Sequence, residues 1–217
     1  MNILVIGNGF DLAHRLQTTY KDFLRVTDEF MIYKTAKENR QELGWSDDED
    51  TRFYKYFISL FNESQRSKDA RKIVEELDML IRENVWLEHF KNTQIENGWI
   101  DFESEISKVI QTLEEVRKIA DDALKQGRSK IELDRRQKGI LRYVGAGVQR
   151  IEDAISIPKE RGLKDLDRLI RCLEIYLSDY VNNYSVENTL PDIKNLPYLD
   201  KILSFNYTNT YERLYNN

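Results

Sequence analysis

The sequence contains very little cysteine and no long apolar run. Its single cysteine, Cys172, cannot form an internal disulfide, which excludes a secreted disulfide scaffold, and its helical surroundings favour a buried thiol. No stretch is long and apolar enough to span a bilayer, and the opening residues 1–6 are too few for the apolar part of a signal peptide. We therefore expect a soluble, cytoplasmic protein.

The chain also lacks an excess of basic residues. Its 38 acidic and 33 basic residues occur in mixed order and give a net charge of -5, so no basic surface is available to bind nucleic acid. The 41% hydrophobic content is sufficient for a packed core. A length of 217 residues suits one domain, or one domain with a large insertion.

Two short apolar runs without polar alternation, Asn2–Ile6 and Lys201–Phe205, have the pattern of buried parallel strands. Nearly everything between them has helical periodicity. We expect helices around 23–31, 53–61, 73–85, 99–116, 131–157 and 163–184, with breaks at 44–50, 92–98, 126–129, 158–162 and 191–197. The predicted fold is α/β but predominantly helical: a single domain of residues 1–217, with 20–195 inserted between two strands of a small parallel sheet.

A glycine turn, residues 7–11, follows the first strand. Gly7 and Gly9 match a strand–turn–helix arrangement whose backbone N–H groups bind phosphate, although Leu12 replaces the third glycine of the dinucleotide fingerprint. A plain tight turn is the alternative. Asp11 is either the N-cap of the next helix or a catalytic or ribose-binding carboxylate. His14, one turn further on, is either a candidate catalytic base or an ordinary core or surface histidine.

Amides and hydroxyls follow the second strand in the segment 204–210. Ligands of open α/β sheets bind at the carboxyl ends of strands, which places Asn206 level with the glycine turn if the two strands are neighbours. The alternative is an Asx or Ser/Thr turn that only leaves the sheet.

A third segment, 97–103, is aromatic and acidic. Glu103, together with Asp101, could serve acid–base chemistry beside the apolar Trp99. Equally, both carboxylates suit the first turn of a helix whose apolar side includes Trp99.

Four segments together carry a family resemblance: 6–14, 19–23, 99–103 and 204–208. In this order they resemble the bacteriophage abortive-infection AbiH family, which is in turn similar to sirtuin-like NAD-binding proteins. The resemblance implies that Gly7 and Gly9 receive the pyrophosphate of NAD. It implies that Asp11 and Asn206 hold or activate the nicotinamide ribose, with Glu103 as a nearby second carboxylate. The expected catalytic residues are Asp11, Asn206, Glu103 and His14; the expected nucleotide-binding residues are Gly7, Asn8, Gly9, Phe10, Asn206, Tyr207 and Thr208; no metal is expected.

The function implied is antiviral defence: binding of NAD or a related nucleotide, and in complete relatives hydrolysis of the nicotinamide N-glycosidic bond. A non-catalytic sensor or scaffold that recognises a phage or host protein is the alternative. Arg15 and Gln17 stand where many relatives have glycine and proline. Relatives also continue beyond the Asn206 turn into a His-Gly pair and further strands. We therefore expect a short form or fragment whose sheet is completed by a homodimer or by a second polypeptide.

Overall fold

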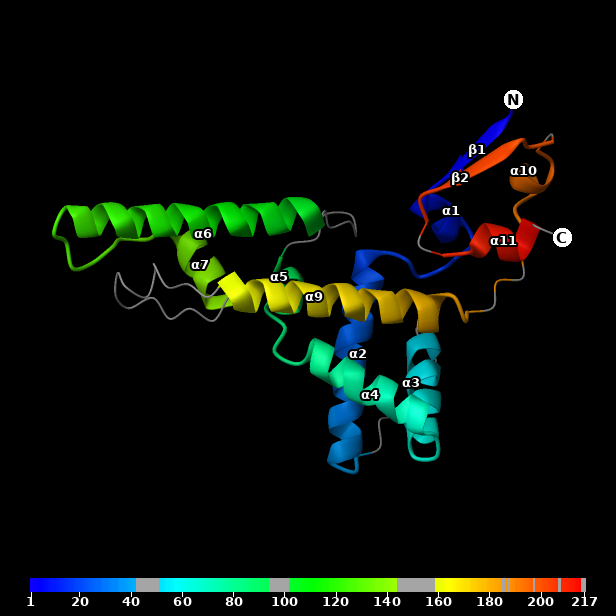
Figure 1. The fold of residues 1–217 in the computed structure, drawn as a ribbon. Coiled ribbons are helices and arrows are strands. Elements are labelled where there is room, and N and C mark those ends of the chain that lie inside the picture. The colour runs from blue at the N-terminus through cyan, green and yellow to red at the C-terminus, as the bar shows by residue number, and fades with distance from the viewer. Residues whose placement is uncertain are drawn as a thin grey trace. The chain divides into compact units, whose positions relative to one another are not determined.

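The computed structural model describes residues 1–41, 51–93, 102–143, 159–184, 186, 188–196, 198–206 and 208–215. It divides the chain into two compact units, one comprising Met1–Leu77 with Arg171–Asn217 and the other Asp78–Ile170. The protein is predominantly helical, as the periodicity predicts, with one small parallel sheet (Figure 1). The unit boundaries fall within two helices, α4 (Lys68–Ile81) and α9 (Lys159–Ile175).

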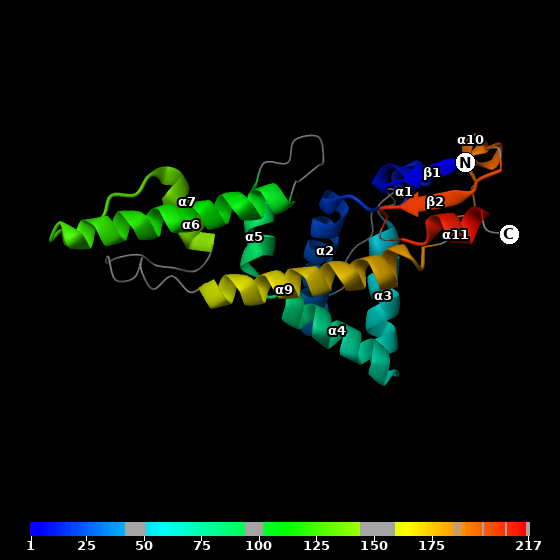
Figure 2. The ribbon, with the colours of Figure 1, turned by 45° about the horizontal axis from the view of Figure 1, so that its top comes forward.

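The sheet of the first unit joins the two ends of the chain. Strands β1 (Ile3–Ile6) and β2 (Lys201–Ser204) are parallel, with Ile3 opposite Lys201 and Ile6 opposite Ser204. The ladder extends one step further, because the N–H of Phe205 donates to the carbonyl of Ile6 at 2.9 Å. The predicted pairing of these two segments is confirmed (Figures 1 and 2).

The two faces of this sheet differ. Leu4 and Ile6 pack with Phe10 and Tyr211, from the short helices α1 (Asn8–Ala13) and α11 (Thr210–Tyr215), and with Ile193 of α10 (Pro191–Lys194). Helix α10 lies within the segment 191–197, for which the sequence predicts a break and no helix.

The opposite face is open. Its apolar side chains are Ile3, Val5, Leu203 and Phe205, which are between 46% and 68% exposed. The prediction that both strands are buried is therefore wrong. In the described part of the chain the sheet has only two strands, and the helices that pack on it contact only the other face. Completion of the sheet by a second copy or another polypeptide stays a prediction.

Long helices make up the rest of the first unit. They are α2 (Tyr20–Glu38), α3 (Thr51–Ser64), most of α4 and the end of α9, which continues into the π-helical turn η2 (Tyr176–Val181). Thr19 begins α2 with a capping box, in which its hydroxyl accepts from the Asp22 N–H while the Asp22 carboxylate accepts from the Thr19 N–H. Edge-on and tilted aromatic rings fill the core between α2 and α3, led by Phe30 and Phe57.

The second unit contains α5 (Val85–Asn92), α6 (Phe102–Lys125), α7 (Arg135–Tyr143) and the start of α9. The predicted helix over 73–85 is wrong at its end: the chain turns at Glu83, where φ is 53°, and Asn84 starts α5. Val116, Ala120 and Ala123 of α6 pack on Leu141 of α7. The predicted helix over 131–157 begins only at Arg135, and its part beyond residue 143 lies outside the described residues.

Cys172 is buried, as its helical surroundings predict. Among the described residues, no helix is long and apolar enough to cross a membrane. No group of histidine, cysteine and acidic side chains in the same part of the chain could hold a metal ion.

His89 in α5 provides a pH-dependent contribution to the second unit. Its Nε2 lies 3.8 Å from a carboxylate oxygen of Glu105 in α6, which also pairs with Lys108. Burial lowers the pKa of His89, and the Glu105 carboxylate offsets only part of that effect. The folded protein therefore binds this proton less readily than the unfolded chain, so His89 reduces stability once the pH falls below about 6.5, the ordinary pKa of histidine.

We expect urea unfolding, followed by tryptophan fluorescence, to show lower stability at about pH 5.5 than at about pH 7.5. The His89→Gln variant should lose part of this difference because glutamine does not titrate. An unchanged pH dependence in that variant would contradict the assignment to His89.

Candidate functional site

Asp11 lies in α1, directly after the carboxyl end of β1. Its side chain is buried, with the residue only 1% exposed, and one carboxylate oxygen, Oδ2, accepts a hydrogen bond from the Thr208 hydroxyl at 2.7 Å. Helix α1 starts at Asn8 with Gly7 as its N-cap, so the alternative of Asp11 as the N-cap is wrong. The hydrogen bond joins the glycine turn to the turn that follows β2, as expected for loops at one edge of a parallel sheet.

The hydroxyls around Asp11 form an ordered chain. Thr208 Oγ1 lies 2.9 Å from Thr210 Oγ1, and because Thr208 uses its only hydroxyl proton on Asp11, Thr210 must be the donor in this second bond. Burial raises the pKa of Asp11, while the hydroxyls of Thr208 and Thr210 and the neighbouring His14 partly counteract the rise. The second oxygen of Asp11, Oδ1, is buried and has no hydrogen-bond partner among the described residues.

Asn206 has the same unusual property. Its backbone N–H donates to the Ser204 hydroxyl at 3.2 Å, so the Ser/Thr turn that was the alternative interpretation is present. Its side-chain oxygen and nitrogen, however, are both buried and without a partner in the part of the chain that the structure describes. An unpaired buried amide costs free energy, which is why such groups usually bind water or a ligand.

Both ring nitrogens of His14 have hydrogen-bond partners within the protein. Its Nδ1 lies 2.7 Å from the Phe10 carbonyl, which can only accept, so Nδ1 carries the proton. In neutral His14, Nε2 then accepts from the Tyr215 hydroxyl at 2.8 Å, and that hydroxyl accepts from the N–H of Leu190. His14 therefore ties α1 to α11 and to the segment before α10.

The glycine turn leaves space beside its backbone. A Cβ atom added at Gly7 or Gly9 would meet no other atom within 4 Å. Asn8 donates from its side chain to the carbonyl of Thr18 at 3.2 Å. Phe10 is buried against His14, Tyr211 and Tyr215, so its ring belongs to the core under the sheet.

The structure does not test the remaining predicted site residues. Glu103 belongs to α6 in the second unit, and its side chain lies outside the described residues, as do Trp99, Asp101 and Tyr207. An approach of the segment 97–103 to the glycine turn thus stays a prediction. Thr210 and Tyr215 received no role from the sequence; Thr210 falls in the polar segment after β2, whereas nothing in the sequence connects Tyr215 with His14.

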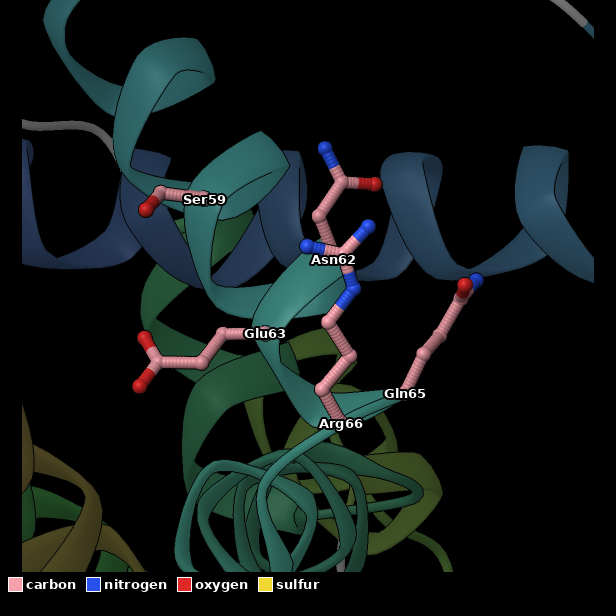
Figure 3. A pocket seen from close by; sticks show the side chains of 5 residues that line it. All are labelled: Ser59, Asn62, Glu63, Gln65 and Arg66. Atoms are coloured by element: carbon pink, nitrogen blue, oxygen red, sulfur yellow. The ribbon is translucent and has the colours of Figure 1, made fainter.

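A separate surface depression lies at the end of α3. Figure 3 shows side chains from one helix end and the following turn, all polar or charged: Ser59, Asn62, Glu63, Gln65 and Arg66. The depression contains none of the predicted site residues, and its lining offers no apolar wall for a nicotinamide ring.

The model of the family described as bacteriophage abortive infection AbiH matches residues 3–217. The chain belongs to the AbiH family. Comparison with curated proteins and with solved structures found no match. AbiH membership implies a role in bacterial abortive infection, and the match includes the glycine turn, the Asn206 turn and both described units.

Proposed function

We propose that this AbiH protein binds NAD or a closely related nucleotide at the carboxyl edge of β1 and β2, as part of anti-phage defence. The observation that carries the proposal is a pair of buried groups there, Asp11 Oδ1 and the side-chain amide of Asn206, for which the described residues provide no hydrogen-bond partner. A buried carboxylate oxygen and a buried amide both reduce the stability of the free protein. A bound ligand that pairs with them would offset this cost.

The chemistry of the two groups suits the ribose part of a nucleotide. Asp11 Oδ1 can only accept while the carboxylate is ionised, and ribose hydroxyls are donors that can reach such an acceptor. Asn206 can both donate and accept. Phosphate would be repelled by Asp11, whereas the space beside the backbone of Gly7 and Gly9 allows a pyrophosphate to approach the turn.

We further propose hydrolysis of the bond between nicotinamide nitrogen and ribose C1′. Water would supply the new C1′–O bond, nicotinamide would leave with the bonding electron pair, and the products would be ADP-ribose, nicotinamide and a proton. The transition state has oxocarbenium character, and the Asp11 carboxylate would stabilise the positive charge that develops on the ribose. The role of His14 in this proposal is structural, because both of its ring nitrogens are used within the protein.

Calorimetric titration with NAD tests the binding step. We expect micromolar binding by the wild type and about tenfold weaker binding by Asn206→Ala, since one to two hydrogen bonds to the ligand are lost. Asn209→Ala is the matched control, because Asn209 lies in the same turn and is exposed. Chromatography of the same mixtures for nicotinamide and ADP-ribose tests hydrolysis.

Absence of binding at millimolar NAD would refute the nucleotide site and favour a sensor or scaffold that recognises a phage or host protein. The open apolar face of the sheet, with Ile3, Val5, Leu203 and Phe205, would then be the first surface to examine. Equal affinities of Asn206→Ala, Asn209→Ala and wild type would instead place the ligand elsewhere.

A further inference from the structure

Thr18, in the connection between α1 and α2, has a buried hydroxyl. Its Oγ1 atom has no hydrogen-bond partner among the described residues, although the residue as a whole is only partly buried. A threonine hydroxyl normally bonds to a nearby backbone group. Thr27, in α2, shows that ordinary situation: it is fully buried and its hydroxyl donates to the Leu24 carbonyl at 2.7 Å.

The position of Thr18 is fixed from both sides. Its carbonyl accepts from the side chain of Asn8, which holds the connection between α1 and α2 against the glycine turn. The preceding residue, Gln17, accepts from two tyrosines of η2: Tyr176 donates to its backbone carbonyl and Tyr180 donates to its side-chain oxygen at 2.6 Å.

These two tyrosine rings are stacked, with centroids 5.5 Å apart and planes inclined by 14°. The backbone at Gln17 and Thr18 is therefore held by hydrogen bonds from Asn8 on one side and from Tyr176 and Tyr180 on the other.

We infer that Thr18 is an additional ligand-binding residue of the nucleotide site, and that its hydroxyl donates a hydrogen bond to an oxygen atom of the bound nucleotide. The inference rests on the proposed function, because the ligand is the one proposed for the glycine turn. Three observations support it: the hydroxyl is buried and has no partner among the described residues, the residue is bonded to Asn8 of that turn, and the two tyrosines hold the adjacent Gln17. No sequence pattern assigns a role to Thr18.

The test uses Thr18→Val, which replaces the hydroxyl with a methyl group of similar size, and Thr27→Val as the matched control. The two variants should change stability in opposite directions without ligand. Thr18→Val removes an unpaired polar group and should raise the melting temperature, whereas Thr27→Val removes a satisfied hydroxyl and should lower it. Calorimetry with NAD should show about tenfold weaker binding for Thr18→Val and no change for Thr27→Val.

The outcomes separate this inference from the proposed function. If the wild type binds NAD and Thr18→Val binds equally well, Thr18 has no role in binding, and the site at Asp11 and Asn206 remains. If the wild type does not bind NAD, the nucleotide site itself is refuted, and the role of Thr18 with it. Weaker binding combined with a higher melting temperature supports the inference, since a purely structural defect would lower both.

Discussion

Asp11→Asn should weaken NAD binding by about tenfold to a hundredfold, the loss expected for hydrogen bonds to a charged group, while the free protein becomes more stable. Asparagine can still accept from Thr208 through its oxygen, so the bond between the two turns is kept. What disappears is a buried negative charge with one unpaired oxygen.

The direction of the stability change in Asp11→Asn follows from the pH dependence of the Asp11 carboxylate. Burial raises the pKa of Asp11 above its ordinary value, so the folded state retains the proton more readily than the unfolded chain. Stability from this group is therefore greatest at low pH and is lost as the pH rises through the raised pKa. Above that raised pKa the wild type carries the full cost of the buried charge. The asparagine variant does not, and its free energy of unfolding should exceed that of the wild type.

Thr208→Val is the informative companion to Asp11→Asn. It removes the donor to Asp11 Oδ2 and leaves a buried carboxylate that has lost this bond, so it should lower the free energy of unfolding by about 1–3 kcal/mol. When Thr208→Val is combined with Asp11→Asn, the buried charge is absent, and Thr208→Val should lower the free energy of unfolding by a smaller amount. A double-mutant cycle from urea unfolding measures this coupling. A destabilised Asp11→Asn with unchanged NAD affinity would show that Asp11 is a structural residue.

The sequence predicts the parallel pairing of the two strands better than it predicts their burial. The apolar runs before Gly7 and before Asn206 are sufficient to predict parallel pairing, because strands that precede polar turns at one sheet edge must run in the same direction. The burial of these strands was not predictable from the same runs. An unalternating apolar strand is buried only where both faces are covered, and coverage depends on elements distant in sequence.

The hydrogen bonds that the side chains of Asp11 and His14 make to Thr208 and Tyr215 are also long-range in sequence. Asp11 meets Thr208 and His14 meets Tyr215, each about two hundred residues away in the chain, as the separations of 197 and 201 show. Local patterns describe Asp11 only as a helix cap or a functional carboxylate. The cap role is excluded because α1 begins at Asn8 with Gly7 as its N-cap, whereas a functional role of the carboxylate stays a prediction.

The turn at Glu83 was missed for a related reason. Periodicity over 73–85 continues across it, because the apolar residues on either side fit one helical stripe. Helix α4 ends there because Asn84 is the N-cap of a new helix. Its side-chain oxygen accepts hydrogen bonds from the N–H groups of Trp86 and Leu87, at 3.0 and 3.2 Å. An asparagine before a helical run is a start signal that the longer periodic pattern concealed.

The second unit depends on a buried carboxylate of α9 that binds the start of α5, and Asp165→Ala should destabilise this unit strongly. Asp165 Oδ2 accepts from the Val85 N–H at 3.2 Å, Oδ1 accepts from Arg168 at 2.5 Å, and the Asp165 carbonyl accepts from Asn84 at 2.9 Å. The side chain of Asp165 is only 3% exposed. Through these bonds it connects α9 to the start of α5.

Alanine at position 165 would leave the Val85 N–H unsatisfied and remove the partner of a largely buried arginine. Removing one member of a buried ion pair typically costs about 3–5 kcal/mol. Arg168 keeps its bonds to the carbonyls of Met79 and Arg82, which places the expected loss near the lower end, at about 3 kcal/mol. Asp167→Ala is the matched control, two positions along the same helix and exposed, for which a change within about 0.5 kcal/mol is expected.

Hydrogen exchange measured by mass spectrometry can localise the effect, which matters in a chain with two compact units. In Asp165→Ala, α5 can open locally without breaking hydrogen bonds to residue 165, so local opening costs less free energy. Peptides from α5 and from the start of α9 should therefore exchange much faster in this variant than in Asp167→Ala. Peptides containing β1 and β2 belong to the other unit and should exchange at the wild-type rate. Equal exchange in the two variants would mean that Asn84 caps α5 adequately without Asp165. Faster exchange throughout the chain would mean instead that the two units unfold together.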